Sequence, residues 1–177
     1  VAGGFVDRDH ELKQLSAAFP ANVVGSPTLC VIMGGKGIGK GSLIREFVRG
    51  SIELNVDTIE LPLQAWNRKQ DVLEWLLGAM KHPEADSGGR SADFVANCLR
   101  ARAGTRPMLL WSDVPCEHFP AQYAICTSLA RLAWACSIEE ASPSNLMFLF
   151  PSSGELQQPE RFTTQIRLEA LNANSIG

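Results

Sequence analysis

The residues whose types and spacing could do chemistry gather in a glycine-rich loop that follows a short apolar segment. The loop runs from Gly34 to Ser42 and reads GGKGIGKGS. Successive backbone N–H groups in such a turn form a concave anion site, a following helix adds the positive end of its dipole, and Lys40 supplies a full charge. Lys36 is a second cation in the loop, either an extra phosphate contact or a solvated side chain. The alternative to a phosphate site is a coincidental glycine turn before a helix.

The loop predicts a site for nucleotide phosphates, although it departs from the full consensus at one position. The consensus is Gly, four residues, Gly, Lys and then a Ser or Thr whose hydroxyl holds magnesium. Gly39 and Lys40 have the required spacing from the first glycine, but Gly41 stands at the hydroxyl position. Ser42, one position later, could reach the ion only if the helix start shifted by one residue. The candidate nucleotide-binding residues of the loop are Gly34, Gly35, Lys36, Gly37, Ile38, Gly39, Lys40, Gly41 and Ser42.

A single acidic residue is available for the second half of a nucleotide-hydrolysing site. Such sites place one acid at the end of a central strand to hold magnesium, with a further group that orients the attacking water. The segment MLLWSDV, residues 108–114, supplies only Asp113. If Asp113 is the metal-side acid, no second acid follows it; if Ser112 takes the metal position, Asp113 orients the water and the metal ligand is missing. A third interpretation is that Asp113 only caps the turn into Pro115.

The elements that must position these residues alternate between strands and helices along the chain. The apolar spacing predicts strands over 28–33, 56–63, 107–111, 145–150 and 164–168. It predicts helices over 9–19, 42–48 with an end at Gly50, 68–80, from an N-capping Ser91 onwards, and 120–140. This alternation predicts an α/β fold with helices on both faces of a five-stranded, mostly parallel sheet. Ligands bind at the carboxyl ends of such strands, where the glycine loop and Asp113 both fall.

Length and composition predict one folded domain over residues 1–177. The chain has 177 residues, of which 45% are hydrophobic and 20% charged, and no apolar run approaches the ~18 residues of a membrane-spanning helix. A net charge of -3 gives no general attraction to a phosphate backbone. We therefore expect neither a membrane nor a nucleic acid as partner.

Five cysteines, an odd number, are spread widely without a metal-binding pair. This usage favours a reduced, cytoplasmic setting. Four of them lie in strand or helix patterns and are predicted to be small core residues: Cys30, Cys98, Cys126 and Cys136. Cys116 lies two residues from His118, but a catalytic pair would need a third partner that the sequence does not show.

The order of these motifs resembles that of a known family. The segment FVDRDHEL, residues 5–12, resembles the Phe-Val-Gly-Arg-Glu-x-Glu-Leu opening of STAND ATPases (signal-transduction ATPases with numerous domains) and of the related origin-recognition group of AAA ATPases. It is followed in the family's order by GGKGIGKGSL, PMLLWSDV, NLMFLF and QIRLEAL. The resemblance implies a three-layer P-loop NTPase sandwich that binds ATP or ADP. Because the family's opening segment packs near the adenine, it also nominates Phe5, Val6 and Arg8 as nucleotide-binding residues.

The departures from the family pattern all weaken magnesium and hydrolysis chemistry. The family loop ends in Gly-Lys-Thr or Gly-Lys-Ser, whereas this one has Gly41 after the lysine. The third strand commonly ends in two acids, and here Ser112 stands at the usual metal position. The fourth strand usually delivers a polar or basic sensor, and residues 150–153, FPSS, contain no base. The chain resembles STAND modules described as inactive. The family's lid and winged helix are not in this sequence, so we expect a core domain from a larger multidomain protein.

Two functions remain in competition. The first is a STAND-like nucleotide-binding or pseudo-ATPase regulatory module in signalling or assembly, partnered by other domains of its polypeptide, by other proteins, or by further copies of itself. The second is an active STAND or AAA ATPase that uses Lys40 and Asp113, with Ser42 and Asp113 as magnesium ligands and Asp113 as the catalytic residue. A phosphotransferase is less favoured because the most loop-like segment, 82–90, has one arginine for a lid. A DNA loader is disfavoured by the acidic composition.

Overall fold

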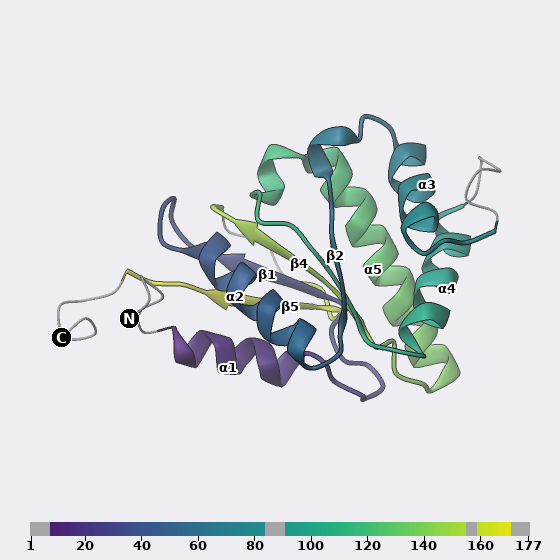
Figure 1. The fold of residues 1–177 in the computed structure, drawn as a ribbon, viewed down its shortest axis with the longest axis horizontal. Helices are drawn as coiled ribbons and strands as arrows, with labels where there is room; N and C mark the ends of the chain where they lie inside the picture. The colour runs from purple at the N-terminus through teal and green to yellow at the C-terminus, as the bar shows by residue number, and fades with distance from the viewer. Residues whose placement is uncertain (1–7, 84–90, 155–158, 171–177) are drawn as a thin grey trace.

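Five parallel strands form a central sheet, and helices cover both of its faces (Figure 1). The computed structural model describes residues 8–83, 91–154 and 159–170. The strand order is β2-β3-β4-β1-β5, and every neighbouring pair is parallel. The strands are β1 (Leu29–Met33), β2 (Asp57–Glu60), β3 (Met108–Trp111), β4 (Leu146–Ser152) and β5 (Thr163–Arg167). The prediction of an α/β fold with a five-stranded, mostly parallel sheet is confirmed.

The helices divide between the two faces and make a three-layer structure. They are α1 (Asp9–Ala18), α2 (Lys40–Glu53), α3 (Lys69–Ala79), α4 (Ala92–Ala103) and α5 (Pro120–Glu140), with 3-10 turns η1 (Leu63–Ala65) and η2 (Cys116–His118). Because side chains alternate along a strand, β1 contributes to both cores. Leu29 and Val31 pack in the core beneath α3, α4 and α5, while Cys30 and Ile32 pack in the core beneath α1 and α2. Within the described residues, no helix is long and apolar enough to cross a membrane.

The position of β1 decides where a ligand can bind. Both β1 and β4 are buried along their whole length, as expected for central strands covered on both faces. β1 lies between β4 and β5, so that Leu29 is opposite Phe148 on one side and Thr163 on the other. At the carboxyl end of the pair, Met33 is opposite Ser152. The glycine loop therefore leaves the sheet between the carboxyl ends of β4 and β5.

Two elements end three residues away from the end that the sequence predicts. The strand expected over 56–63 ends at Glu60, because Pro62 has no N–H to donate and the chain turns into η1. The helix expected to end at Gly50 continues to Glu53. Gly50 is tolerated inside α2, and the helix ends instead before Asn55, whose φ of 64° is left-handed.

The buried face of α5 also differs from the predicted one. The apolar spacing of residues 120–140 predicts a core-facing stripe of Ile125, Leu129, Leu132 and Cys136; Leu129 is fully buried, whereas the other three are only partly buried. The fully buried side chains of α5 are mostly small: Cys126, Leu129, Ala130, Ala133 and Ser137. The predicted stripe is therefore correct only at Leu129, because the side of α5 that faces the sheet otherwise holds small residues. The cap predicted at Ser91 is confirmed, since its Oγ accepts a hydrogen bond from the N–H of Phe94 at 3.2 Å.

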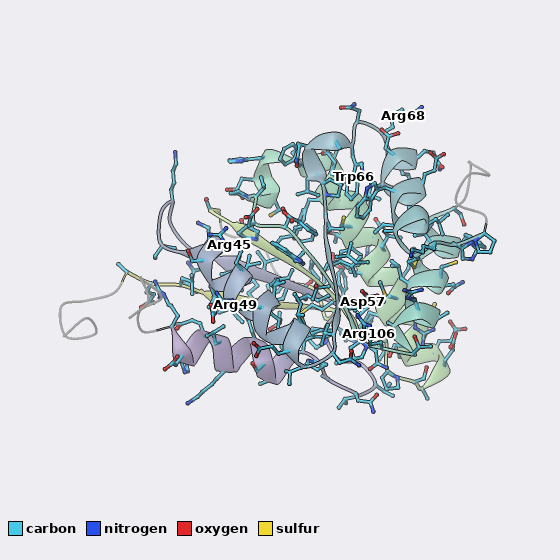
Figure 2. The ribbon with its side chains drawn as sticks, viewed as in Figure 1. Arg45, Arg49, Asp57, Trp66, Arg68 and Arg106 are labelled. Atoms are coloured by element: carbon cyan, nitrogen blue, oxygen red, sulfur yellow. The ribbon has the colours of Figure 1, made fainter. Side chains whose placement is uncertain are left out.

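An exposed ion cluster lies at the amino-terminal ends of the strands, opposite the end that carries the glycine loop. Asp57 at the start of β2 lies 3.6 Å from Arg106 and 3.8 Å from Arg102 (Figure 2). A charged residue on an edge strand also discourages pairing with another chain. These charges lie at the amino ends of the strands and leave the carboxyl edge to the glycine loop.

Candidate phosphate-binding site

The backbone of the loop after β1 requires glycine at Gly34, where there is no room for a side chain, and at Gly39, where φ is positive. At Gly34 the chain passes so close to its surroundings that a Cβ would lie 2.9 Å from Cγ2 of Ile38 and 3.1 Å from the carbonyl oxygen of Leu168. At Gly39, the N-cap of α2, φ is 104°, a conformation that other residues rarely adopt. The first helical hydrogen bond runs from Leu43 N to the Gly39 carbonyl at 3.0 Å. The N-terminus of α2 therefore opens directly beside the loop.

The side-chain ammonium of Lys40 points into the glycine loop. Its side chain is nearly buried, with 6% exposure. Nζ donates hydrogen bonds to the carbonyls of Gly34 at 2.7 Å and Gly35 at 2.9 Å, and to Oγ of Ser153 at 3.4 Å. No carboxylate pairs with Lys40 in the described part of the chain. Among the described residues, the ammonium group is therefore held in place by neutral acceptors, with no carboxylate there to compete with an anion.

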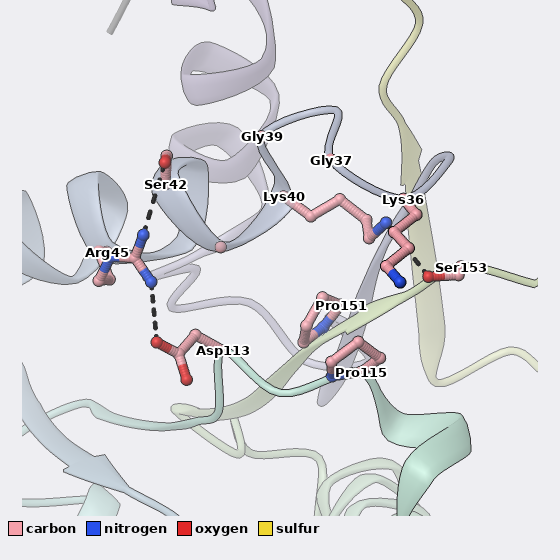
Figure 3. A pocket seen from close by; sticks show the side chains of 11 residues that line it. Lys36, Gly37, Gly39, Lys40, Ser42, Arg45, Asp113, Pro115, Pro151 and Ser153 are labelled. Carbon is pink, nitrogen blue, oxygen red and sulfur yellow. Dashed lines mark hydrogen bonds and ion pairs between the residues drawn. The ribbon is translucent and has the colours of Figure 1, made fainter. Parts of the chain in front are cut away.

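A cavity of about 340 Å³ opens in front of this lysine (Figure 3). Three cations and one acid contribute to its wall, which leaves it net positive. The lining residues are Lys36, Gly37, Gly39, Lys40, Gly41, Ser42, Arg45, Asp113, Pro115, Pro151 and Ser153. The structure thus brings most of the predicted loop residues and Asp113 into one cavity. Lys36 is exposed on its wall, while Gly34, Gly35 and Ile38 shape the loop behind it.

Of the three residues nominated near the adenine, Arg8 is described, and Phe5 and Val6 lie outside the described residues. Arg8 is buried, and its Nη2 donates a hydrogen bond to the carbonyl of Ile38 at 3.1 Å. Its Nη1 also lies 3.9 Å from the carboxylate of Glu11. Arg8 does not line the cavity. In this structure it ties the chain before α1 to the back of the glycine loop.

Arg45 is a cavity residue that the sequence reasoning missed. Its Nη1 lies 2.8 Å from Oδ2 of Asp113, and its Nη2 lies 3.5 Å from Oγ of Ser42 (Figure 3). Nη1 is also only 3.2 Å from the place that a Cβ on Gly41 would occupy. A signal was present, because residues 41 and 45 are one helical turn apart and long side chains lean toward the helix N-terminus.

The two polar residues of the turn after β3, Ser112 and Asp113, have different hydrogen-bond partners. Ser112 is buried, and its Oγ accepts a hydrogen bond from the N–H of Val114 at 3.0 Å. Ser112 therefore caps the turn toward Pro115. One interpretation of the sequence gave this capping role to Asp113. Asp113 points to Arg45 instead and retains 31% side-chain exposure.

A second acid lies behind the cavity wall, in η2. Glu117 accepts hydrogen bonds from the N–H of Ser153, at 2.9 Å to Oε2 and 3.2 Å to Oε1. Partial desolvation would raise the pKa of Glu117, but hydrogen bonds from the backbone N–H groups of Glu117 and Ser153 outweigh it and hold that pKa below its ordinary value. The carboxylate orients Ser153, whose hydroxyl in turn accepts from Lys40. Sequence spacing gave no signal for this contact, which joins residues 36 positions apart.

All five cysteines are free thiols. Burial raises the pKa of Cys116 to about 11, so this residue is no thiolate nucleophile at neutral pH. Burial likewise raises the pKa of Cys30 and of Cys126 to about 12. Cys98 and Cys136 were predicted to be core residues as well, but both are only partly buried.

Comparisons with known proteins identify the architecture. No protein-family model matches the sequence, and no curated protein matches it. Among solved structures, Cdc6p from Pyrobaculum aerophilum is similar with a TM-score of 0.66 and 14% identity, over 99% of this chain and 48% of that one. The Aeropyrum pernix ORC2 protein, solved in ADPNP–ADP complexes, gives 0.63 and 16% over 99% and 52%.

The chain shares the α/β fold of these two solved proteins. At 14% and 16% identity the likeness establishes architecture alone. The chain spans about half the length of these two solved proteins.

A glycine loop of this pattern ordinarily holds a magnesium ion between the residue after its lysine and an acid at the end of a central strand, here β3. The residues found there do not fit it. Gly41 has no side-chain oxygen, and the hydroxyl of Ser112 is committed to the turn. Ser42 and Asp113, the candidate ligands, both contact the positively charged Arg45. In the described part of the chain, no three His, Cys, Asp or Glu side chains gather as metal ligands would.

Proposed function

We propose that the chain is a pseudo-ATPase module that binds ATP or ADP by its phosphates and hydrolyses it slowly or not at all. One observation carries this proposal. The same cavity is lined by the glycine loop with Lys40 and by Arg45, whose Nη1 lies 2.8 Å from Oδ2 of Asp113. This combination supports a site that has kept the groups for phosphate binding and lost those for magnesium and hydrolysis.

The groups for phosphate binding already point into the cavity. The loop backbone and the N-terminus of α2 supply oriented N–H dipoles for an anion. Lys40 now uses the neutral carbonyls of Gly34 and Gly35, and a phosphate oxygen would be a stronger, charge-assisted acceptor. An adenine nucleotide is supported by the Aeropyrum pernix ORC2 protein, which shares the fold and was solved in ADPNP–ADP complexes. The resemblance of residues 5–12 to a segment that packs near adenine points the same way.

Within its protein, the module is proposed to act as a STAND-like regulatory part in signalling or assembly. The motif order supports this role, and the half coverage of the solved relatives fits a core domain of residues 1–177 that works with other domains. Its partners are then those domains, other proteins or further copies of itself in the cytoplasm. Nucleotide occupancy would be read out by α1, because Arg8 ties the start of that helix to the loop.

An active ATPase that uses Lys40 and Asp113 is the second candidate. Its support is that Ser42 and Asp113 do line the same cavity as Lys40. For hydrolysis, Arg45 would have to leave both residues so that they could hold magnesium. Assembly with further copies could supply that change.

The test is a calorimetric titration of the purified chain with ATP and with ADP, beside Lys40→Ala and Lys13→Ala variants. Lys13 is an exposed lysine on α1, so its variant controls for the loss of one positive charge. We expect Lys40→Ala to weaken binding about 10- to 100-fold, the value of a charge-assisted hydrogen bond. Lys13→Ala should bind as the parent does. Circular dichroism would verify that both variants are folded.

Phosphate release in magnesium separates the two candidate functions. The pseudo-ATPase is expected to release no more phosphate than the Lys40→Ala variant. Turnover that disappears in both Lys40→Ala and Asp113→Asn would instead support the active ATPase. Absence of any nucleotide binding by the folded parent would refute both candidates.

A further inference from the structure

We propose that the guanidinium of Arg45 is a built-in replacement for magnesium, so that this cavity binds nucleoside di- and triphosphates without a metal ion. The inference rests on the proposed nucleotide binding and specifies the ionic form of the ligand. It predicts a free nucleotide as ligand, whereas sites of this fold ordinarily hold the magnesium complex.

The position of Arg45 carries the argument. Its guanidinium lies between Asp113 at 2.8 Å and Ser42 at 3.5 Å, the two groups that could have held the ion. The same guanidinium lies 3.2 Å from where residue 41 would place a Cβ. Arg45 therefore contacts both Ser42 and Asp113 and lies beside Gly41, where the consensus places the magnesium-binding hydroxyl.

The charge of the cavity fits a bare nucleotide. Lys36, Lys40 and Arg45 supply three positive charges, and Asp113 removes one. A divalent cation held between Ser42 and Asp113 would lie against the guanidinium and be repelled by it. A polyphosphate would meet net positive charge without help from a metal.

Arg45 has the donors that this role requires. A guanidinium has five N–H donors, and the contacts to Asp113 and Ser42 engage one nitrogen each. Its side chain retains 54% exposure, so the remaining donors can reach a ligand from the cavity mouth. Arginine also matches phosphate oxygens in a bidentate geometry that a lysine cannot make.

Not every arginine of α2 reaches the cavity. Arg49 lies one turn further along, pairs with Glu46 at 2.6 Å and is 69% exposed (Figure 2). It does not line the cavity. Arg49→Ala is therefore a matched control that removes the same charge from the same helix.

The experiment titrates ADP and ATP into the parent in excess EDTA and in excess magnesium, with Arg45→Ala, Arg45→Gln and Arg49→Ala beside it. The parent is expected to bind at least as tightly in EDTA as in magnesium, because excess magnesium complexes the nucleotide in solution and the guanidinium repels the bound ion. In EDTA, Arg45→Ala and Arg45→Gln should bind about 10- to 100-fold more weakly, and Arg49→Ala as the parent does. Arg45→Gln retains polar bulk if Arg45→Ala proves poorly folded, and melting curves identify which variants are folded.

A double variant, Gly41→Thr with Arg45→Ala, tests the replacement from the opposite direction. It supplies the missing hydroxyl and removes the guanidinium, so its nucleotide binding should strengthen when magnesium is added. Electron paramagnetic resonance of added manganese should then show a bound ion with the double variant plus ADP, and none with the parent plus ADP.

Each outcome separates this inference from the proposed function. No binding by the folded parent in either buffer would overturn the proposed function itself. Binding by the parent that requires magnesium would leave that function standing and overturn the role of Arg45. Undiminished binding by folded Arg45 variants in EDTA would overturn it as well.

Discussion

Two glycines of α2 should respond in opposite directions when each is replaced by alanine. Gly39 caps the helix with a φ of 104°, and no atom lies within 4 Å of the position for a Cβ. Its replacement therefore meets no steric contact and carries only backbone strain. Gly50 lies inside the helix without a positive φ, and the space for its Cβ is also empty. Alanine there gains helix propensity and introduces no clash.

The magnitudes follow from these two backbone states. Holding a residue other than glycine in a conformation like that of Gly39 costs about 1–3 kcal/mol. At this chain length 1 kcal/mol shifts the melting temperature by about 2–4 °C, so Gly39→Ala should melt roughly 2–12 °C lower. Gly50→Ala should gain about 0.5–1 kcal/mol and melt about 1–4 °C higher.

Urea unfolding followed by circular dichroism measures both free energies, and a nucleotide titration shows whether Gly39→Ala also disturbs the loop. Because the strained residue supplies the carbonyl that begins α2, its relaxation should displace the N–H groups that face the cavity. We expect weaker nucleotide binding in Gly39→Ala and parental binding in Gly50→Ala. If Gly39→Ala were as stable as the parent, the loop would tolerate an ordinary backbone there, and the argument for a required left-handed N-cap would be wrong.

Two further predictions concern acid and thiol chemistry. The pKa of Glu117 is lower in the folded chain than its ordinary value, so its carboxylate stabilises the fold above about pH 4 and loses that effect as the pH falls through the folded pKa. Urea unfolding should therefore show Glu117→Gln to be less stable than the parent near pH 7, with the difference shrinking in acid; a constant difference would contradict this assignment. In native alkylation followed by mass spectrometry, the partly buried Cys98 and Cys136 should be modified first. The thiols expected to react only on unfolding are Cys30, Cys116 and Cys126.

The glycine loop and the alternation of elements could be predicted because both are local in sequence. A glycine with positive φ and a lysine at the start of a helix are signalled by a few neighbouring residues. The side-chain contacts that line the cavity could not be predicted from the sequence, because they join segments far apart along the chain. Arg45 and Asp113 are 68 positions apart, and no spacing rule connects them.

Burial within helices was predicted less well than helix position. Ile125, Leu129, Leu132 and Cys136 of α5 were expected to face the core because they repeat at helical spacing, and only Leu129 is fully buried. The sheet instead receives the small residues Ala130 and Ala133, which let the helix approach closely. Which face of an apolar helix is buried depends on the shape of its neighbours, and a single sequence does not contain that shape.

The place of β1 between β4 and β5 has a consequence for how the chain folds. Leu29 pairs with Phe148 and Thr163, both from the last third of the sequence, so β1 cannot gain either neighbour until most of the chain has been synthesised. Such non-local pairing is slow. The phosphate cradle at the end of β1 is then among the last parts to form. On the proposed nucleotide binding, only chains that have completed this step would bind the ligand, which would selectively stabilise fully folded molecules over partly folded ones.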